Sequence, residues 1–284
     1  MGTLFLLPSV FISLTCISYI YTAEIANGYD FKILRRVTTN RHDFDLLIFT
    51  QQWPATACKE WKKKDHSHSC SMPPKVDSWS IHGIWPTKLG EMGPSFCNRT
   101  WLFDPEQIRP IEDQLESVWV NIFAGTSLYS LWSHEWTKHG TCAAVLDKFN
   151  SEFKYFSMGL EWLQQYSMSN ILQSNNIVPS NTQQYAIEDI NKAVKEKLGV
   201  DPVIECKKED GENYISEIRI CFTKDLKITN CDGVLFPVVY SNIDGESILT
   251  NCDKSMKVTY PHYVSTSWTV HLHSLLSWLR WLTL

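Results

Sequence analysis

The most informative segment of the sequence is Ser133–Cys142, which reads SHEWTKHGTC. On an α-helix, at about 100° per residue, Glu135 and His139 lie four residues apart and share a face. Lys138 lies beside them, and His134 lies at the edge of the same arc. The spacing therefore predicts one helix that directs two imidazoles, a carboxylate and a cation toward one point. The alternative is a solvated helix surface, where ion pairs at this spacing are common.

A zinc helix is the first rival interpretation of this stretch. His134 and Glu135 resemble the start of an H-E-x-x-H motif, in which the second histidine follows the first by four residues. Here His139 follows by five, which on a regular helix turns it by about 140° from His134. Two imidazoles so placed could not bind one zinc ion. We therefore expect no metal and no cofactor here.

A second histidine stands earlier in the chain, in the segment IHGIWP at Ile81–Pro86. When RNA is cleaved, the 2′-hydroxyl loses a proton as it attacks phosphorus, and the leaving 5′-oxygen gains one. Two imidazoles can perform both transfers, each contributing about 10²–10⁴-fold. A lysine would stabilise the charge that builds on the non-bridging oxygens. These residue types favour phosphodiester transfer without a metal.

The two segments, Ile81–Pro86 and Ser133–Cys142, resemble in sequence and order the two active-site blocks of the ribonuclease T2 family. Phe49–Pro54, which reads FTQQWP and is followed by Cys58, is similar to the family's first strand. Cys97–Arg99 also fits the family pattern. The resemblance covers roughly Asp43 to Tyr260. It implies a single-stranded RNA substrate.

The resemblance implies a role for each of five residues. His139 would be the general base on the 2′-hydroxyl, and His82 would be the general acid to the 5′-oxygen. His134 would hold the phosphate, while Glu135 and Lys138 would stabilise the pentacovalent phosphorus. The expected product is a 2′,3′-cyclic phosphate, which is hydrolysed more slowly to a 3′-phosphate.

Three further residues are candidates for binding the bases of the substrate. Trp85 offers an aromatic face, which accepts any base with little sequence demand; the alternative is a core tryptophan at a strand end. Thr87 stands where relatives can place an acidic base-reading residue, so no base preference follows. Gln52 offers an amide to a second base.

The hydrophobic pattern mixes strand and helix signals along the chain. Asp43–Gln51 and Trp79–Trp85 are predicted strands, the second ended by Pro86. Four segments have helical character: Glu106–Val120, Leu128–Cys142, Ser151–Tyr166 and Thr182–Leu198. Pro202–Tyr260 is predicted to be mostly β. The fold class is therefore α+β, with an antiparallel β-sheet core, several packed helices and a single disulfide-stabilised domain.

The two ends of the chain differ from this domain. Residues 1–23 carry no charged side chain and include an apolar run, which predicts a secretory signal peptide, with a membrane anchor as the alternative. Residues 24–262 form the predicted catalytic domain, and its arm at Glu24–His42 departs from the family pattern. Residues 263–284 are a Trp- and Leu-rich extension. It is an amphipathic or disordered tail or a discarded lipid-anchor signal, and Arg280 favours the former.

Nine cysteines become eight once Cys16 is removed with the signal peptide. An even number in an exported chain predicts four disulfides. The family resemblance implies the pairs Cys58–Cys70, Cys97–Cys142, Cys206–Cys252 and Cys221–Cys231.

A zinc knuckle is the alternative for one cysteine pair, because His66 and His68 lie between Cys58 and Cys70. These histidines are separated by one residue, whereas zinc motifs space them by three to five. A basic loop closed by a disulfide is the preferred interpretation. Asn98 begins the single Asn-x-Ser/Thr sequon and is the predicted glycosylation site.

The formal net charge is −5, from 26 basic and 31 acidic residues. This is the wrong sign for binding RNA by phosphate neutralisation at neutral pH. Charging all nine histidines would change the net charge from −5 to +4, so we expect activity to favour acidic conditions.

The sequence thus predicts a monomeric, metal-independent endoribonuclease that is secreted or held in a lysosome or another acidic vesicle. The alternative is a secreted recognition or signalling glycoprotein on a ribonuclease scaffold. The intact set of five catalytic residues argues against that alternative. Membrane anchoring through the C-terminal extension remains an open, weaker expectation.

Overall fold

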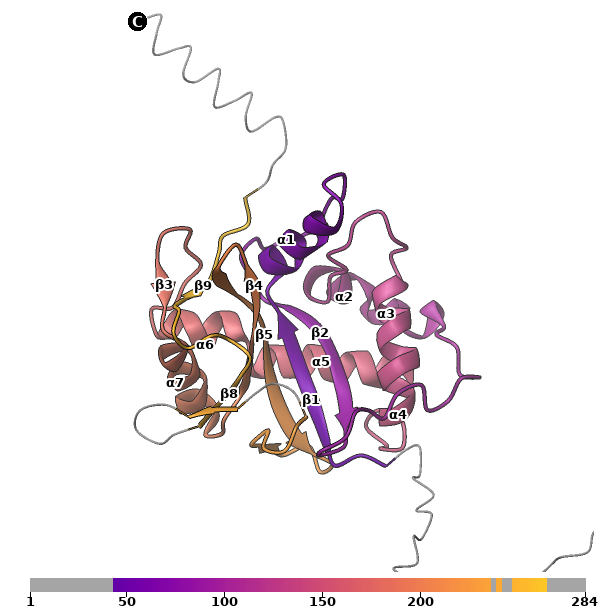
Figure 1. Ribbon diagram of the computed structural model, residues 1–284. Coiled ribbons are helices and arrows are strands. Elements are labelled where there is room, and N and C mark those ends of the chain that lie inside the picture. The colour runs from indigo at the N-terminus through magenta and orange to yellow at the C-terminus, as the bar shows by residue number, and fades with distance from the viewer. Residues whose placement is uncertain (1–42, 236–238, 242–246, 265–284) are drawn as a thin grey trace, which may run out of the picture. The chain divides into compact units, whose positions relative to one another are not determined.

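The computed structural model describes residues 43–235, 239–241 and 247–264 (Figure 1). These residues belong to one structural unit, Thr39–Leu284. The predicted signal peptide lies outside the described residues, and so does the C-terminal extension apart from Tyr263 and Val264. The proposed boundaries after residues 23 and 262 therefore stay predictions.

A sheet forms the centre of the fold, and its main path runs in the order β2-β1-β5-β4-β8-β7. The strands are β1 Leu46–Gln52, β2 Ser80–Thr87, β3 Gln184–Tyr185, β4 Val203–Glu209, β5 Glu212–Thr223, β6 Ile228–Thr229, β7 Val239–Ser241, β8 Ser247–Thr250 and β9 Val258–Thr259. The long pairings β1–β2, β1–β5 and β4–β5 are antiparallel. Two short pairings, β4–β8 and β5–β9, are parallel. The predicted α+β class with an antiparallel core is confirmed.

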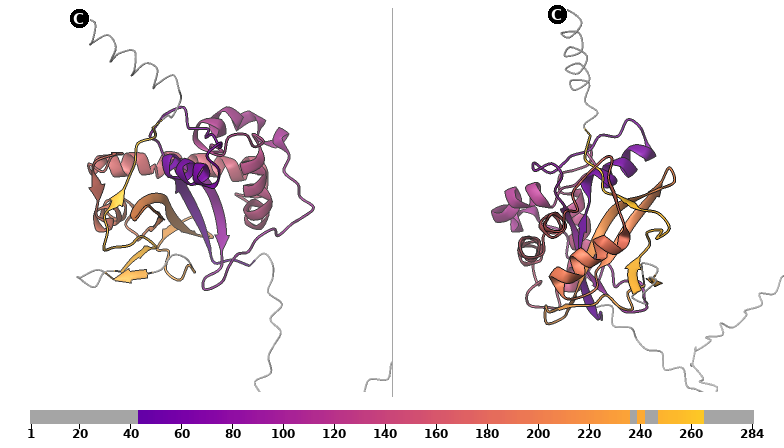
Figure 2. Two further views of the ribbon diagram at one scale, coloured as in Figure 1. Left: turned by 45° about the horizontal axis from the view of Figure 1, so that its top comes forward. Right: turned by 90° about the vertical axis from the view of Figure 1, so that its left-hand side faces the viewer.

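Helices cover one face and one edge of this sheet. They are α1 Pro54–Lys64, α2 Glu112–Val118, α3 Ser130–Glu135, α4 Thr141–Ala143, α5 Glu152–Gln165, α6 Met168–Ser174 and α7 Ile187–Leu198. Figure 1 shows α5 crossing behind the central strands and α3 beside β2, and Figure 2 gives the side view. Trp162 of α5 stacks on Phe222 of β5 at 3.9 Å and meets the edge of Phe49 of β1 at 5.6 Å. This aromatic layer fixes the back of the sheet.

Several predicted boundaries move for local reasons. The Glu106–Val120 segment holds two 3₁₀ turns before α2 begins, because Pro110 cannot continue an α-helical ladder. Pro86 does not end β2, which runs on to Thr87. On this edge strand its missing N–H costs no sheet bond.

Two further segments differ from the prediction. The Thr182–Leu198 segment starts as the short strand β3, and α7 ends where Gly199 adopts a left-handed conformation. The sequence analysis did not predict α1 or α6. Among the described residues, none of the helices is both long and apolar enough to cross a membrane.

Candidate active site

His82 occupies a bulge in β2. Thr50 of β1 pairs with Gly83 and the next residue, Gln51, pairs with Ile81, so His82 is the extra residue. The bulge changes the alternation of side chains, which lets Ile81 and Ile84 both enter the core although they are three residues apart. His82 is thereby directed to the open face of the sheet, with 32% of its side chain exposed.

Two side chains from the helical layer fix this irregular strand. Trp119 Nε1 donates to the His82 carbonyl at 2.9 Å. Tyr155 Oη donates to the Ile84 carbonyl at 2.9 Å and accepts from the Ile84 N–H at 3.3 Å. The bulge therefore keeps its backbone groups satisfied while it presents the imidazole.

A buried ion network on β4 and β5 holds the His82 ring. His82 Nδ1 donates to Glu217 Oε1 at 2.6 Å. Arg219 donates to Glu217 Oε2 through Nε at 3.0 Å and Nη2 at 2.6 Å, and Nη2 also donates to Glu205 Oε2. Only 11% of the Glu217 side chain is exposed, so substrate can reach His82 but hardly its carboxylate partner.

The catalytic segment predicted as one helix contains a wide turn. After α3 the chain forms a π-helical turn over Trp136–Gly140, in which the Thr141 N–H bonds to the Trp136 carbonyl five residues back. The hydroxyls of Thr137 and Thr141 bond to carbonyls four residues earlier, at 2.7 and 2.9 Å, a pattern that distorts helices. Gly140 is required because a Cβ there would lie 2.2 Å from the Trp136 ring.

This turn corrects the assumption of a regular helix. The rings of His134 and His139 lie 6.5 Å apart, centroid to centroid, because the π turn brings residues five apart toward the same side. The separation of about 140° that a regular helix would give His134 and His139 therefore does not apply here, and it does not exclude a shared metal ion. Lys138 stands between the two histidines in sequence and its charge disfavours a bound cation. Within the described ranges, no group of three or more His, Cys, Asp or Glu is arranged to hold a metal.

Glu135 lies beneath the two histidine segments and is buried, with 1% exposure. Trp85 Nε1 donates to its Oε2 at 2.8 Å. A Cβ on Gly83 would lie 2.0 Å from the same oxygen, so only glycine admits the carboxyl at this point. The Gly in the IHGIWP segment thus makes room for the Glu of the other segment.

The surroundings shift the pKa values of the two key histidines in opposite directions. Burial alone would lower the pKa of His82, but the charge of Glu217 and its hydrogen bond raise it above the ordinary value. Burial lowers the pKa of His139 well below its ordinary value, and the charges of Lys138 and His134 lower it further. Divergent shifts of this kind are typical of a pair in which one imidazole is the acid and the other the base.

The other two catalytic candidates are also shifted. Burial raises the pKa of Glu135 to about 7, so its carboxyl is protonated under acidic conditions. Partial burial lowers the pKa of His134, with Lys138 adding to the effect.

A pocket of about 410 Å³ opens beside His139. Trp85 and Thr87 line it, as do Lys138, Glu205 and Arg219. The Trp85 ring lies 5.1 Å from that of His82 and 5.5 Å from that of His139. Trp85 is half-buried and lies against both histidine rings, which favours the base-stacking interpretation over a core role. Gln52 is half-buried at the end of β1 and is not among the residues lining this pocket.

The disulfides join the pairs that the resemblance implies: Cys58–Cys70, Cys97–Cys142, Cys206–Cys252 and Cys221–Cys231. Cys97–Cys142 ties the end of the catalytic helix to the loop that borders the pocket, where the Phe96 N–H also donates to the Lys138 carbonyl at 2.9 Å. Asn98 follows in an exposed turn, and its Oδ1 accepts from the Thr100 hydroxyl at 2.8 Å.

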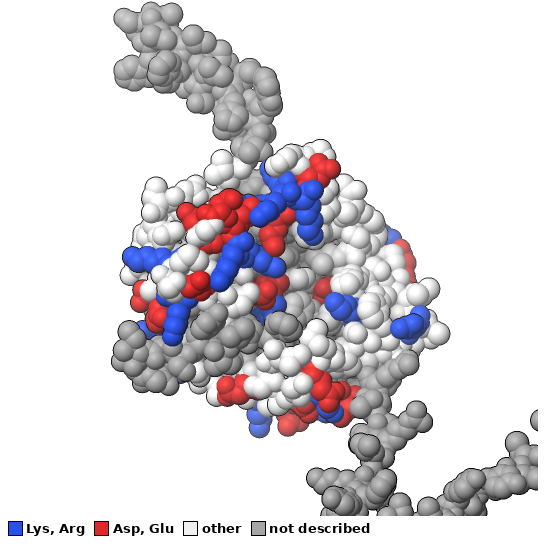
Figure 3. Space-filling view, viewed as in Figure 1, with Lys and Arg blue, Asp and Glu red and all other residues white. Residues whose placement is uncertain are grey.

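The basic segment closed by Cys58–Cys70 includes the second half of α1, where basic side chains gather beside acidic ones (Figure 3). Lys59 and Lys63 approach Glu209 at 3.9 and 3.6 Å. Part of the positive charge is thus compensated within the protein. The zinc-knuckle alternative is wrong for this loop, because its two cysteines are joined to each other.

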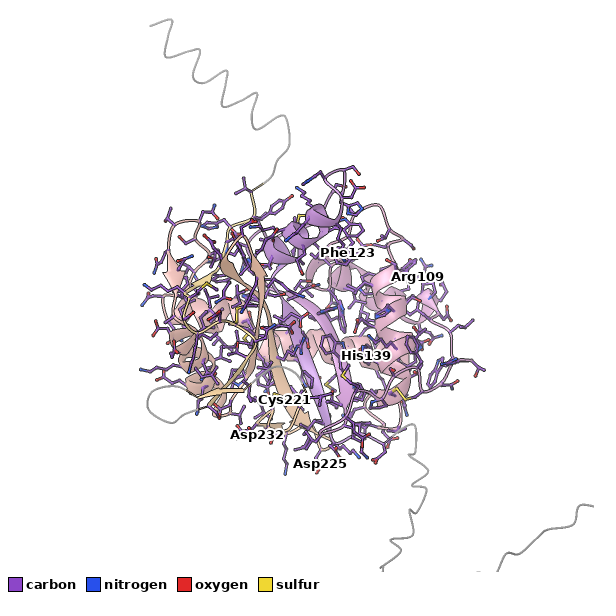
Figure 4. The ribbon with its side chains drawn as sticks, in the orientation of Figure 1. Arg109, Phe123, His139, Cys221, Asp225 and Asp232 are labelled. Carbon is purple, nitrogen blue, oxygen red and sulfur yellow. A yellow bond between two sulfur atoms is a disulfide. The ribbon has the colours of Figure 1, made fainter. Side chains whose placement is uncertain are left out.

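Glu205, Glu217 and Arg219 were not among the site residues predicted from the sequence. Their segment carries a hydrophobic strand pattern with charged residues at alternate positions, which is usual for a half-exposed strand. The one signal was that a strand predicted near the core includes both an acid and a base. Figure 4 shows His139 beside β2, whereas these three residues come from β5 and β4, which β1 separates from β2.

Comparisons with known proteins agree with this geometry. The sequence profile of the ribonuclease T2 family matches residues 44–231. Ribonuclease Oy of Magallana gigas is 41% identical over 194 residues, which cover 67% of this chain and 88% of that protein. Ribonuclease T2 of Danio rerio is 35% identical over 234 residues, covering 79% and 90%.

Solved structures give the same result. RNase NT in complex with 5′-AMP superimposes with a TM-score of 0.62 at 31% identity, covering 78% of this chain and all (100%) of that one. Human RNase T2 superimposes with a TM-score of 0.61 at 30% identity, covering 77% and 99%.

Proposed function

The chain belongs to the ribonuclease T2 family and is a T2-type endoribonuclease, and from this premise we propose that it cleaves single-stranded RNA by metal-independent transphosphorylation. The observation that carries the mechanism is that His82 and His139 both lie against the Trp85 ring, at 5.1 and 5.5 Å, in surroundings that shift their pKa values in opposite directions. His82 stays protonated and His139 stays neutral over a shared range of pH.

In the first step, neutral His139 takes the proton of the 2′-hydroxyl as that oxygen attacks phosphorus. The bond from phosphorus to the 5′-oxygen breaks, and protonated His82 gives its proton to that oxygen. The products are a 2′,3′-cyclic phosphate and a free 5′-hydroxyl. In the slower second step the roles reverse, because His82 is now neutral and His139 is protonated. Water then opens the cyclic phosphate to a 3′-phosphate.

Three neighbours stabilise the phosphorus during transfer. Lys138 supplies positive charge to the non-bridging oxygens, and His134 holds the phosphate. Glu135 suits this site because its raised pKa keeps the carboxyl neutral at acidic pH. A neutral carboxyl donates a hydrogen bond to an anionic oxygen, whereas a carboxylate would repel it.

The pocket beside His139 binds the base of the substrate. The ring of Trp85 provides the stacking surface, and Thr87 lies at the wall. Gln52 is the candidate contact for a second base because it lies on β1, directly across from Glu217 on the open side of the sheet.

The compartment and the modification follow from the same chemistry. Four disulfides favour an oxidising environment, so we place the protein outside the cell or in an acidic vesicle. Asn98 carries an N-linked glycan in this proposal because its sequon lies in an exposed turn. The active form is a monomer.

RNA digestion across pH, with a metal chelator present and the product ends identified, tests the function. We expect a 2′,3′-cyclic phosphate to form first, with the highest rate on the acidic side of neutrality, where Glu135 is protonated. The exposed His262, which bonds to Asp77, offers a matched control, and His262→Ala should cleave RNA as the wild type does. Loss of cleavage on chelation, or products with 5′-phosphates, would disprove the mechanism.

A further inference from the structure

The network behind His82 contains two carboxylates that face each other across paired strands. Glu205 of β4 stands directly opposite Glu217 of β5 in the sheet register. Like charges in such a pair repel. Arg219 bonds to both carboxylates and is itself largely buried, with 13% of its side chain exposed. The arginine is therefore required to hold the two acids together.

Glu217 is the carboxylate that the protonated His82 compensates. Despite its burial, the His82 imidazolium and Arg219 lower the pKa of Glu217 to about 2, whereas burial raises the pKa of Glu205. Of the other charges near His82, Glu135 favours the imidazolium and Arg219 opposes it. Loss of the His82 proton would remove one of the two cations that compensate the buried Glu217, which is unfavourable. The network thus favours the form of His82 that a general acid needs.

The same arginine reaches the base pocket. Arg219 Cζ lies 5.1 Å from the centre of the Trp85 ring, a cation–π contact. Arg219 and Glu205 also line the pocket with Trp85. A base that stacks on Trp85 would therefore restrict the arginine that holds Glu217.

We propose that Glu217 and Arg219 form a positioning relay that links the base pocket to the general acid. Glu217 holds His82 through Nδ1, which leaves the Nε2 proton for the 5′-oxygen as the phosphorus–oxygen bond breaks. Arg219 holds Glu217 and packs on Trp85, so that an occupied base pocket steadies the acid. The relay rests on the proposed function, because it acts through His82 as the acid.

Substitution of Glu217→Gln tests the relay, because the amide keeps the shape and a hydrogen-bond acceptor but removes the charge. The alkaline limb of the pH profile of kcat/KM should move to lower pH by about one unit. Above that limb, kcat for RNA should fall by about 10-fold, as a shift of one pH unit requires, while KM changes little. The purely structural alternative predicts an equal loss at every pH.

A second substrate separates the relay from a general loss of structure. A nucleoside 3′-(4-nitrophenyl phosphate) has a leaving group that departs without protonation. Glu217→Gln should cleave this ester at the wild-type rate, whereas equal losses on RNA and ester would overturn the proposal. Glu212→Gln, on the same strand, is the matched control and should behave as the wild type on both.

Titration of the His82 ring by NMR gives a readout that does not depend on turnover. In Glu217→Gln the His82 pKa should fall below that of the wild type, and an unchanged pKa would overturn the relay. Addition of a nucleoside monophosphate should raise the pKa in the wild type but less in Arg219→Gln. If wild-type protein yields no cyclic phosphate, the proposed function fails, and the titration still decides whether Glu217 controls His82.

Discussion

The two histidines proposed as acid and base lie in contrasting surroundings. His82 comes from a bulged edge strand, and a carboxylate from two strands away holds its Nδ1. His139 comes from a π-helical turn, where Lys138 and His134 are its charged neighbours. The same side chain is therefore raised in pKa on the sheet and lowered on the helix. The chemistry of each imidazole depends on what the fold places beside it.

The two regions also respond differently to pH. The raised pKa of His82 contributes stability that is fully present below its ordinary value of 6.5 and is lost as pH rises through the folded value. The lowered pKa of His139 acts in the opposite sense, and its stabilising effect is lost as pH falls below 6.5. The sheet side thus favours acid and the helix side favours neutral conditions.

The largest expected effect comes from removing each histidine in turn. His82→Ala and His139→Ala should each lower kcat/KM for RNA by about 10²–10⁴-fold. On a nucleoside 3′-(4-nitrophenyl phosphate), His82→Ala should keep its activity because no acid is needed, while His139→Ala should lose it. Steady-state kinetics on both substrates measure the contrast. Equal behaviour of the two variants on the ester would break the distinction between acid and base.

A smaller effect is expected from substitution of Glu135, whose carboxyl accepts a hydrogen bond from Trp85 of β2. Its folded pKa of about 7 exceeds the ordinary 4.5, so its contribution to stability is present below 4.5 and is lost as pH rises through 7. Glu135→Gln removes this dependence. Between pH 4 and pH 8, the difference in free energy of unfolding between the variant and the wild type should therefore change by about 2–3 kcal/mol in favour of the variant.

Chemical denaturation at the two pH values measures this gain. Glu196→Gln on the exposed end of α7 controls for the loss of one surface charge. If the free energies of unfolding of Glu135→Gln and the wild type change in parallel with pH, the buried carboxyl does not cause the pH dependence of stability.

The smallest of the three effects concerns the contact between the two segments. Gly83→Ala puts a Cβ 2.0 Å from Glu135 Oε2 and 2.3 Å from Trp85 Nε1, so both side chains must shift. We expect a loss of about 1–3 kcal/mol in the free energy of unfolding. The rate on RNA should fall as well, because the donor to Glu135 moves. Thermal unfolding and RNA cleavage test this, and a variant with wild-type stability would show that the two segments are not tightly packed.

Much of the fold could be predicted from the sequence. The strand at Asp43–Gln51 and the helix at Ser151–Tyr166 follow from hydrophobic spacing, and the structure has them at Leu46–Gln52 and Glu152–Gln165. Helix α1 was not predicted because its pattern is weak and it begins at Pro54, which resembles a strand end.

Less of the site could be predicted. The two histidine segments predict phosphodiester chemistry, because their residue types suit that reaction better than the zinc-dependent alternative. Glu217 and Arg219 lie far along the chain from both segments, and a charged pair on a strand has no special pattern. Their contact with His82 exists only because β1 pairs with both β2 and β5.

The residue types and their order along the chain predict the candidate groups: three imidazoles, a lysine, a glutamate and the tryptophan beside them. Their surroundings depend on the tertiary structure. The bulge at His82 and the π turn before Gly140 set the directions of the side chains, and neither follows from a regular helix or strand period. Burial and long-range charges then set the pKa values, because electrostatic effects depend on distance through space and on exclusion of water rather than on separation along the chain.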